Sequence, residues 1–174
     1  MMSQKILVAY ATRAGSTGEV AQAIAETLRQ EGLDVDLRRA REVADVSPYR
    51  AVVLGAPIRA FRWMPEAMRF LRRHREALKR IPVAYFAVCI ALMEDTEENR
   101  RLVESWMEPA RAILEPVRVG LFAGKMDYSR LSFGERFIIQ RMKVPEGDHR
   151  DWEAIRAWAR EVAGVLRDRM AEEE

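Results

Sequence analysis

The sequence predicts an α/β fold in which a doubly wound sheet of five parallel strands, in the order 2-1-3-4-5, carries helices on both faces. Two observations predict this class. Short apolar runs alternate along the chain with segments of helical spacing, which is the pattern of βαβ units with right-handed crossovers. The 174 residues match one domain in size, and a hydrophobic share of 49% is enough for one core. We therefore expect a single domain over residues 1–174.

Five runs are predicted as strands. The second, LDVDLR, alternates apolar and polar side chains as a half-covered edge strand does, and the other four are short and apolar, as buried strands of a parallel sheet are. In chain order the predicted strands are 5–10, 33–38, 49–55, 82–90 and 117–123.

Four segments are predicted as helices, because their apolar residues recur every three or four positions. Gly32 is a stop signal after the first, and the third opens with EDTEEN, whose acidic residues suit the first turn of a helix. In chain order the predicted helices are 16–30, 65–78, 95–114 and 151–170. Residues 124–150 are too long for a simple strand-to-helix loop, so we expect an insertion there with a functional role.

The net charge of +2 is unevenly distributed. Residues 59–80 hold eight Arg or Lys against Glu66 and Glu76, which gives this segment a local charge of +6. Such a patch attracts an anionic ligand, an anionic membrane or nucleic acid, or it is a solvated helix face. No nucleic-acid recognition motif accompanies the patch, so we expect no nucleic-acid partner.

Cysteine, histidine and hydropathy patterns limit the cofactors and the compartment. The single cysteine, Cys89, cannot form an internal disulfide and lies in an apolar run, so we expect a core residue in a reducing compartment. We expect His74 on the surface and His149 in the long loop, and hence no metal site.

The longest apolar run, 81–93, is shorter than the roughly 20 residues that span a bilayer, and no signal peptide is recognised. We expect a cytoplasmic protein, at most peripheral to the inner face of the cell membrane.

The strongest functional signal is TRAGST, residues 12–17, directly after the first predicted strand. In an open parallel sheet, ligands bind beyond the carboxyl ends of the strands where the strand order reverses. The backbone N–H groups of this loop and the start of the following helix predict an anion cradle. Thr12, Ser16 and Thr17 add hydroxyl donors, and Gly15 lets the backbone approach a ligand closely. Arg13 adds charge or remains in solvent.

The alternative for this loop is a plain helix cap. Ser16 or Thr17 would then cap the helix, with Glu19 close to the capping-box position. Capping explains one hydroxyl but not three hydroxyls and a glycine, so a phosphate site is favoured. Neither G-x-x-x-x-G-K-[ST] nor G-x-G-x-x-G occurs, which argues against a P-loop and against a dinucleotide-binding fold.

The stretch ILVAYATRAGSTGEVAQAIAETL resembles the phosphate loop of flavodoxins, which bind FMN through a T-x-T-G-x-T pattern. The match is at Thr12, Gly15 and Thr17, and Ala14 stands where a second threonine is usual. Three later stretches resemble the flavodoxin-domain family that includes menaquinone-dependent protoporphyrinogen IX dehydrogenase: GAPIRAFRW, AGKMDYSRLSFGERFIIQRMK and GDHRDWEAIRAWAREVA. The resemblance spans nearly the whole chain and implies a flavodoxin-like fold with FMN as cofactor.

The resemblance also implies which residues bind FMN. The phosphate would lie on the first loop, and the isoalloxazine ring between the loops after the third and fourth strands. A charge beside the ring tunes a flavin, and Arg59 there would favour the anionic reduced form. Phe61 or Trp63 would cover a ring face or pack against the helix that starts at Pro65. The implied FMN-binding residues are Thr12, Arg13, Ala14, Gly15, Ser16, Thr17, Ala56, Pro57, Ile58, Arg59, Cys89, Ile90, Ala91 and Leu92.

The activity that the resemblance implies is an FMN-dependent oxidoreductase that passes electrons from a porphyrinogen-like substrate to a quinone. Arg59 and Arg62 would bind the substrate's carboxylates through bidentate hydrogen bonds, with Trp63, Tyr128 and Arg130 as further substrate contacts. No catalytic residue is identified. Residues 133–143 predict a basic amphipathic helix that touches a membrane surface, frames an entrance for a quinone or covers the end of the sheet.

Two other functions remain open from the sequence. The first is a flavodoxin-type electron carrier that serves a redox partner protein, although such carriers are usually strongly acidic and this chain has a pI near 8.9. The second is a protein without redox activity that has kept the fold. A homo-oligomer is compatible with any of these functions.

Overall fold

Five parallel strands form the central sheet of the computed structural model, which describes residues 5–173. The sheet order is β2-β1-β3-β5-β6, and a short strand, β4, pairs antiparallel with β3. The predicted order 2-1-3-4-5 is confirmed, because these strands are the five that were predicted, and β5 and β6 are the fourth and fifth of them along the chain. In sheet order the strands are β2 (Asp34–Arg39), β1 (Lys5–Tyr10), β3 (Ala51–Arg59), β5 (Val83–Cys89) and β6 (Arg118–Ala123).

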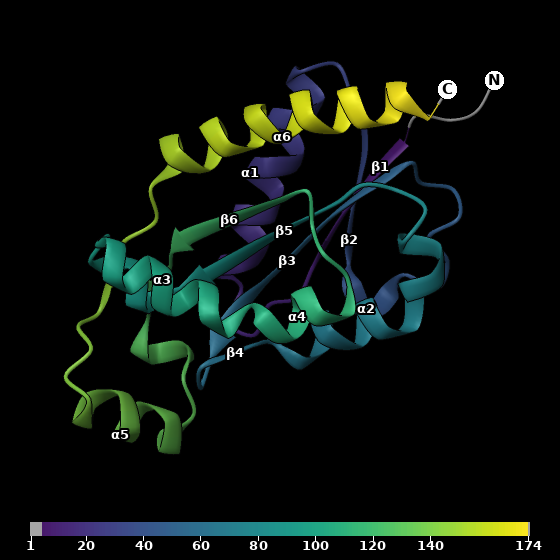
Figure 1. Cartoon of the computed structure of the whole chain (residues 1–174). Helices are drawn as coiled ribbons and strands as arrows, with labels where there is room; N and C mark the ends of the chain where they lie inside the picture. Colours follow the sequence, from purple (N-terminus) through teal and green to yellow (C-terminus); the bar gives the residue numbers. More distant parts are fainter. Residues whose placement is uncertain (1–4, 174) are drawn as a thin grey trace.

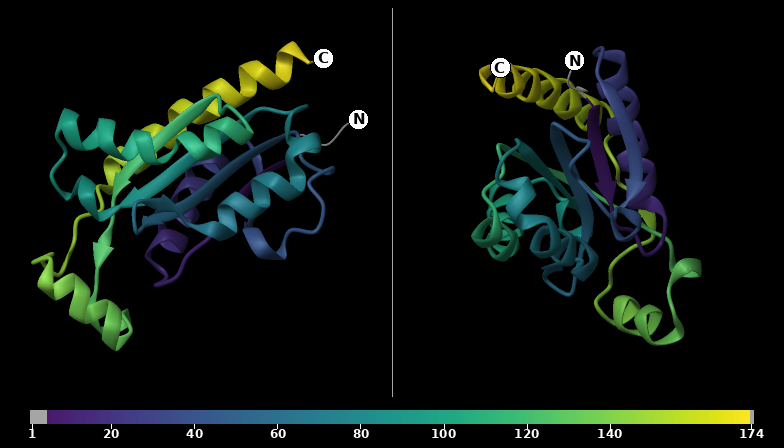
Figure 2. Two further views of the ribbon diagram at one scale, coloured as in Figure 1. Left: turned by 60° about the horizontal axis from the view of Figure 1, so that its bottom comes forward. Right: turned by 90° about the vertical axis from the view of Figure 1, so that its right-hand side faces the viewer.

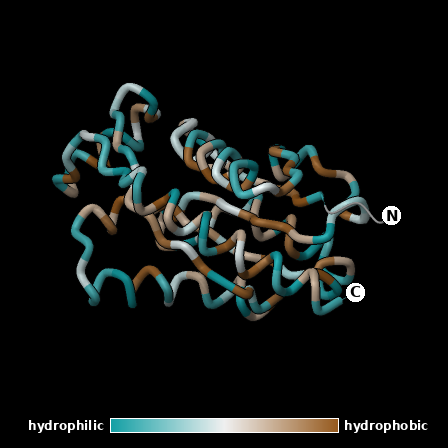
Figure 3. The backbone as a smooth tube through the Cα atoms, turned by 90° about the horizontal axis from the view of Figure 1, so that it is seen from above, coloured by the Kyte–Doolittle hydropathy of each residue, from teal (hydrophilic) through white to brown (hydrophobic). Residues whose placement is uncertain are grey.

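Helices cover both faces of the sheet, as Figures 1 and 2 show. One face carries α1 (Ser16–Gln30) and α6 (Trp152–Glu172), which pack against each other. The other face carries α2 (Pro65–Leu78), α3 (Glu97–Trp106) and α4 (Glu108–Ile113). The buried side chains form one cluster on each face. In Figure 3 the hydrophobic segments, coloured brown, gather along the strands that cross the middle of the molecule.

The segment predicted as one helix over 95–114 forms two helices, so that prediction is wrong in its length. α3 ends at Trp106, and α4 begins at Glu108 with Pro109 in its first turn. In one continuous helix, Pro109 would have no N–H to donate to the carbonyl of Ser105, and its ring would collide with that carbonyl. Met107, at the break, is fully buried, which explains why the apolar spacing continues through both helices.

His74 lies in the core rather than on the surface, which corrects the sequence expectation. It follows Phe70 by one helical turn on the buried face of α2, and the two rings lie 4.7 Å apart. Burial lowers the pKa of His74, and the charge of Arg73 lowers it further. The arginines between its buried neighbours point to solvent along α2, so this part of the basic segment is a solvated helix face.

A glycine allows close packing between β3 and β5. Gly55 lies directly opposite Phe86 in the parallel register, so both residues present the same face of the sheet. A Cβ at Gly55 would overlap the Phe86 ring, which is fully buried. Phe86 thus uses the space left by the missing side chain.

β3 extends four residues beyond its predicted end and turns back into β4 (Arg62–Trp63). Arg59 pairs with Arg62 across this hairpin, so Ala60 and Phe61 form a two-residue turn. Both turn residues have positive φ, 50° and 64°, as the favoured two-residue hairpin turns require.

The insertion at 124–150 is a small substructure beyond the carboxyl edge of the sheet. Its two ends pair as antiparallel strands, β7 (Lys125–Met126) and β8 (Gly147–Asp148). Between them lie the 3-10 turn η3 (Tyr128–Arg130) and α5 (Phe133–Arg141), so the predicted helix is confirmed in position. Figures 1 and 2 show α5 standing away from the sheet and its covering helices. No residue of α5 is buried.

Candidate functional site

The loop between β1 and α1 leaves main-chain donors at the start of α1. Gly15 is the N-cap residue with φ of 91°, and no side chain caps the helix. The alternative of a cap by Ser16 or Thr17 is therefore wrong. The Thr12 hydroxyl instead accepts from the Gly15 N–H at 2.9 Å and closes the loop. The first N–H groups of a helix lack partners within that helix, so they point outward as a cradle for an anion.

Arg39, at the end of β2, binds the start of this loop. Its Nη2 donates to the carbonyl oxygen of Thr12 at 2.6 Å, and its Nε donates to Glu66 at 3.2 Å. The Glu66 side chain is almost entirely buried, and a buried carboxylate requires such a partner. The pair therefore fixes the start of the loop to α2.

Two further loops end at the same edge of the sheet, because β3 and β5 are parallel neighbours that follow β1 in the sheet order. Residues 56–59 belong to the extended end of β3, and the Ala11 N–H donates to the carbonyl of Gly55 at 2.9 Å. After Cys89 the chain forms the 3-10 turn η2 (Ile90–Met93). Asn99 braces this turn, since its Nδ2 donates to the carbonyls of Ala91 and Glu94 at 3.2 and 2.8 Å. The structure thus brings all three predicted loops together.

Cys89 lies at the end of β5 and is buried, as expected. Burial raises the pKa of its thiol. A buried thiol of raised pKa is a poor nucleophile, so Cys89 is not suited to thiolate chemistry.

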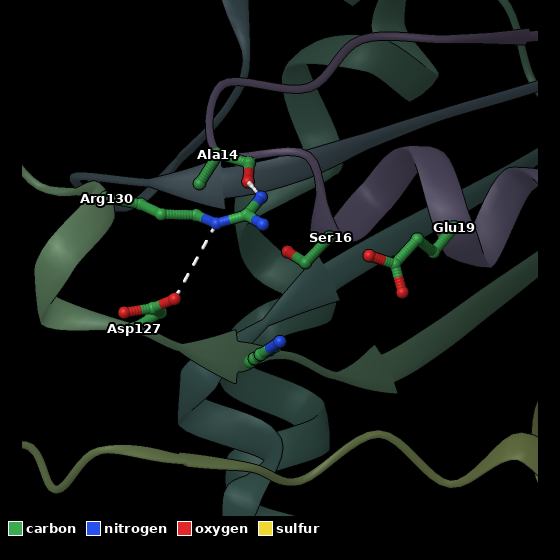
Figure 4. Close-up of a pocket in the computed structure, with 6 residues that line it drawn as sticks. Ala14, Ser16, Glu19, Asp127 and Arg130 are labelled. Carbon is green, nitrogen blue, oxygen red and sulfur yellow. Dashed lines mark hydrogen bonds and ion pairs between the residues drawn. The ribbon is translucent and has the colours of Figure 1, made fainter.

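The insertion reaches back onto the loop of residues 12–17. A guanidinium N–H of Arg130 donates to the carbonyl of Ala14 and also lies 2.8 Å from where a Cβ of Gly15 would be. Arg130 and Asp127 pair at 3.6 Å. Both line a small pocket (Figure 4), whose other lining residues are Ala14, Ser16, Glu19 and Lys125. A cation is therefore present next to the uncapped start of α1.

Arg150 anchors the end of the insertion to α1. Its side chain is 4% exposed, donates to Ser16 O at 3.3 Å and pairs with Glu19 at 3.1 Å. It also pairs with Asp148 at 2.7 Å, and this hydrogen bond lowers the pKa of Asp148 to about 2. The Arg150 guanidinium lies 4.6 Å from the Trp152 ring centre, a cation–π distance.

Glu135 of α5 links two loops of the site. Its carboxylate accepts from Arg13 at 2.5 Å and from Arg59 through its other oxygen. Burial acts to raise the pKa of Glu135, but the Ser132 hydrogen bond and the charges of Arg59 and Arg13 outweigh burial and lower the pKa. Glu135 is therefore a firmly ionised carboxylate between two guanidinium groups.

The residues expected to contact substrate have different surroundings. Trp63 is 3% exposed, donates from Nε1 to Ala56 O at 3.1 Å and packs on Tyr85, which favours the packing alternative. Phe61 is 65% exposed, and its ring centre lies 5.3 Å from the ring centre of Trp106. Arg62 is exposed beside Arg59, and the Tyr128 hydroxyl donates to Val144 O within the insertion.

Sequence reasoning missed Arg39, Glu135 and Arg150 as parts of the site, and it named Arg130 only as a substrate contact beside Tyr128. Only Glu135 had a local signal, since Ser132 and Glu135 form an S-x-x-E pattern and the Ser132 hydroxyl caps α5. Arg39 and Arg150 contact the loop and the start of α1 through Thr12 and Ser16, which lie far away in sequence.

The donor set fits an anionic ligand. Main-chain N–H groups and a φ-positive glycine suit a phosphate, and three guanidinium groups (Arg13, Arg59 and Arg130) surround the loop. Among residues 5–173, no three His, Cys, Asp or Glu side chains gather in a way that could hold a metal ion. No helix of that same range is both long and apolar enough to cross a membrane.

Fold and site together define an open parallel α/β protein with an uncapped helix start at its topological switch point. A family model described as a flavodoxin domain matches residues 7–153. The chain belongs to the flavodoxin-domain family.

Known proteins that resemble this chain fall into two groups. Protoporphyrinogen IX dehydrogenase [quinone] of Escherichia coli K12 is 28% identical over 175 residues, which cover 91% of this chain and 94% of that protein. A Streptococcus pneumoniae flavodoxin aligns with a TM-score of 0.57 at 16% identity, over 93% of this chain and 99% of its own. A Fusobacterium nucleatum flavodoxin mutant bound to flavin mononucleotide aligns with a TM-score of 0.51 at 15% identity, over 71% of each chain. These structural likenesses show the shared fold.

Proposed function

We propose that the protein is an FMN-dependent oxidoreductase that transfers electrons from a porphyrinogen-like substrate to a quinone. The observation that carries the proposal is the uncapped start of α1, where Gly15 in a left-handed conformation leaves main-chain donors facing a cluster of arginines. The flavodoxin-domain family and the E. coli relative, which is named as a protoporphyrinogen dehydrogenase, support the cofactor and the substrate class.

The roles of the residues follow from their places in the site. The N–H groups of residues 12–17 would hold the FMN phosphate, and the backbone of Ala56–Arg59 and Cys89–Leu92 would line its ring. FMN, when bound, supplies the redox chemistry. Arg59 and Arg62 are cations that can bind substrate carboxylates. The substrate loses electrons and protons, and the quinone takes up both and becomes a quinol.

The test supplies protoporphyrinogen and menadione, a small quinone, to FMN-loaded protein under anaerobic conditions. We expect protoporphyrin fluorescence to appear several times faster than with free FMN at the same concentration. Equal rates would contradict the proposal. If a flavodoxin reductase reduces the protein rapidly while protoporphyrinogen is not turned over, the electron-carrier alternative holds instead.

We further propose that α5 contacts an anionic membrane surface, where a quinone would be available. Four large apolar side chains on and just after α5 are exposed; Phe133, at 89%, is the most exposed of them, and the others are Phe137, Ile138 and Met142. Arg136, Arg141 and Lys143 lie among them, and no acidic side chain in the described part of the chain pairs with these three. Exposed aromatic and cationic side chains together favour the interface of an anionic bilayer.

Vesicle sedimentation tests this contact. The wild-type chain should bind phosphatidylcholine vesicles that contain phosphatidylglycerol, and binding should weaken as salt rises. Phe133→Ser combined with Phe137→Ser should weaken binding at least about tenfold, because each change removes an apolar side chain from the interface. Leu102→Ser, at an exposed apolar position of α3, is the matched control and should not change binding. Equal binding by the double variant and the wild type would refute the proposal.

A further inference from the structure

The Glu135 carboxylate occupies a clamp built from two separate loops of the site. One carboxylate oxygen accepts from Arg13, which follows β1, and the other accepts from Arg59, which ends β3. The Ser132 hydroxyl donates to the first oxygen at 3.0 Å. Each guanidinium therefore donates to one oxygen of the same group, which is the donor arrangement that a carboxylate needs.

We propose that Arg13 and Arg59 form a carboxylate-binding subsite for the substrate, and that Glu135 is an internal occupant that a substrate carboxylate displaces. This inference rests on the proposed function, and it pairs Arg59 with Arg13 rather than with Arg62. Replacing one carboxylate by another keeps both guanidinium groups paired with an anion. The exchange therefore avoids leaving a partly buried cation without a partner.

The packing of the insertion allows this exchange. α5 has no buried residue, so the departure of Glu135 uncovers no part of the hydrophobic core. The base of the insertion is held independently by the β7–β8 pair and by Arg150. Substrate binding would thus release the α5 end of the insertion while its base stays attached, and the insertion acts as a latch over the site.

The ligand class is a carboxylate rather than the FMN phosphate for a geometric reason. The main-chain donors of residues 12–17 already provide a phosphate cradle. Arg13 and Arg59 instead converge on a group held by α5, outside that backbone loop. If the FMN phosphate were the displacing group, removing the Glu135 charge would tighten FMN binding, and the experiment below measures this separately.

The test uses mesoporphyrin IX, a fluorescent porphyrin with two carboxylates, and its uncharged dimethyl ester. Glu135→Gln keeps the size and the Ser132 contact but removes the competing charge. It should bind mesoporphyrin about five- to tenfold more tightly than wild type, a gain expected from losing two partly exposed ion pairs. Arg13→Gln and Arg59→Gln should each weaken mesoporphyrin binding by about tenfold. The dimethyl ester should bind all four proteins alike.

Controls and a second measurement separate this inference from a structural effect. Glu153→Gln removes a surface carboxylate that pairs with Arg160 and should change no affinity. Amide hydrogen exchange in residues 131–142 should speed up in Glu135→Gln alone, and in wild type only when mesoporphyrin is added. FMN affinity should stay within about twofold of wild type in Glu135→Gln.

Three outcomes would overturn the inference. Equal mesoporphyrin affinity of wild type and Glu135→Gln would do so while leaving FMN binding and turnover intact, so the proposed function would survive. Tighter FMN binding by Glu135→Gln without tighter mesoporphyrin binding would identify the phosphate as the displacing group. No mesoporphyrin binding by any variant would overturn both this subsite and the porphyrinogen substrate class.

Discussion

Replacing Gly15 by alanine should lower FMN affinity at least about thirtyfold, because the loop depends on a conformation that side chains disfavour. Gly15 has φ of 91°, where an L-residue is strained, and it sets the direction of the first N–H groups of α1. A Cβ there would also lie 2.8 Å from a guanidinium nitrogen of Arg130. FMN fluorescence quenching during titration measures the affinity.

Gly32 provides a matched control for this experiment. Its φ is 89°, and a Cβ there would meet no atom within 4 Å. Gly15→Ala and Gly32→Ala should therefore lower the free energy of unfolding by similar amounts, about 1 kcal/mol. Only Gly15→Ala should lower the affinity for FMN. Similar FMN affinities of the two variants would contradict the assignment of the loop as the phosphate site.

Gly55→Ala should lower the free energy of unfolding by about 3 kcal/mol, the upper part of the range for overpacked cores. The new methyl group would overlap the ring of Phe86, the partner of Gly55 on the neighbouring strand β5. Phe86 is fully buried, so its ring cannot move aside into solvent. Urea unfolding followed by circular dichroism measures the change. Gly164→Ala on α6, where a Cβ meets nothing within 4 Å, should instead stabilise the protein by up to about 1 kcal/mol.

A double-mutant cycle tests the cause of this loss. Phe86→Ala alone should cost about 3–5 kcal/mol through the cavity that it leaves. Combined with Gly55→Ala it should cost at least about 1 kcal/mol less than the sum of the single changes, because the new methyl group then fills part of that cavity. Additive losses would show that Gly55 matters for its backbone and not for the ring that lies over it.

Four strands could be predicted because they are short and apolar, and the edge strand β2 because its apolar and polar side chains alternate. KILVAY and VAYFAVC illustrate this: every residue of β5 is buried. The break between α3 and α4 could not be read from periodicity, because Met107 keeps the apolar spacing across it, although Pro109 was a usable signal. His74 was misplaced because its charged neighbours outweighed its position, one turn from Phe70, on the apolar stripe.

One part of the candidate site consists of neighbours in sequence, and the other part consists of residues that are far apart in sequence. TRAGST could be recognised because its donors, its hydroxyls and its glycine lie within six consecutive residues. Glu135 contacts Arg13 across 122 residues and Arg59 across 76. No spacing rule connects such positions in a single sequence, because only the placement of the insertion over the carboxyl edge brings them together.

The paired base of the insertion makes it a separable module. Lys125 lies opposite Asp148, and the His149 N–H donates to Gly124 O at 3.1 Å, so the segment departs and returns at almost one point. Loop-closure entropy grows by only about 0.6 kcal/mol for each doubling of length. Evolution can therefore exchange or resize everything between those anchors without disturbing the sheet. A protein engineer could likewise graft this hairpin onto a plain electron carrier of the same topology and ask which properties travel with it.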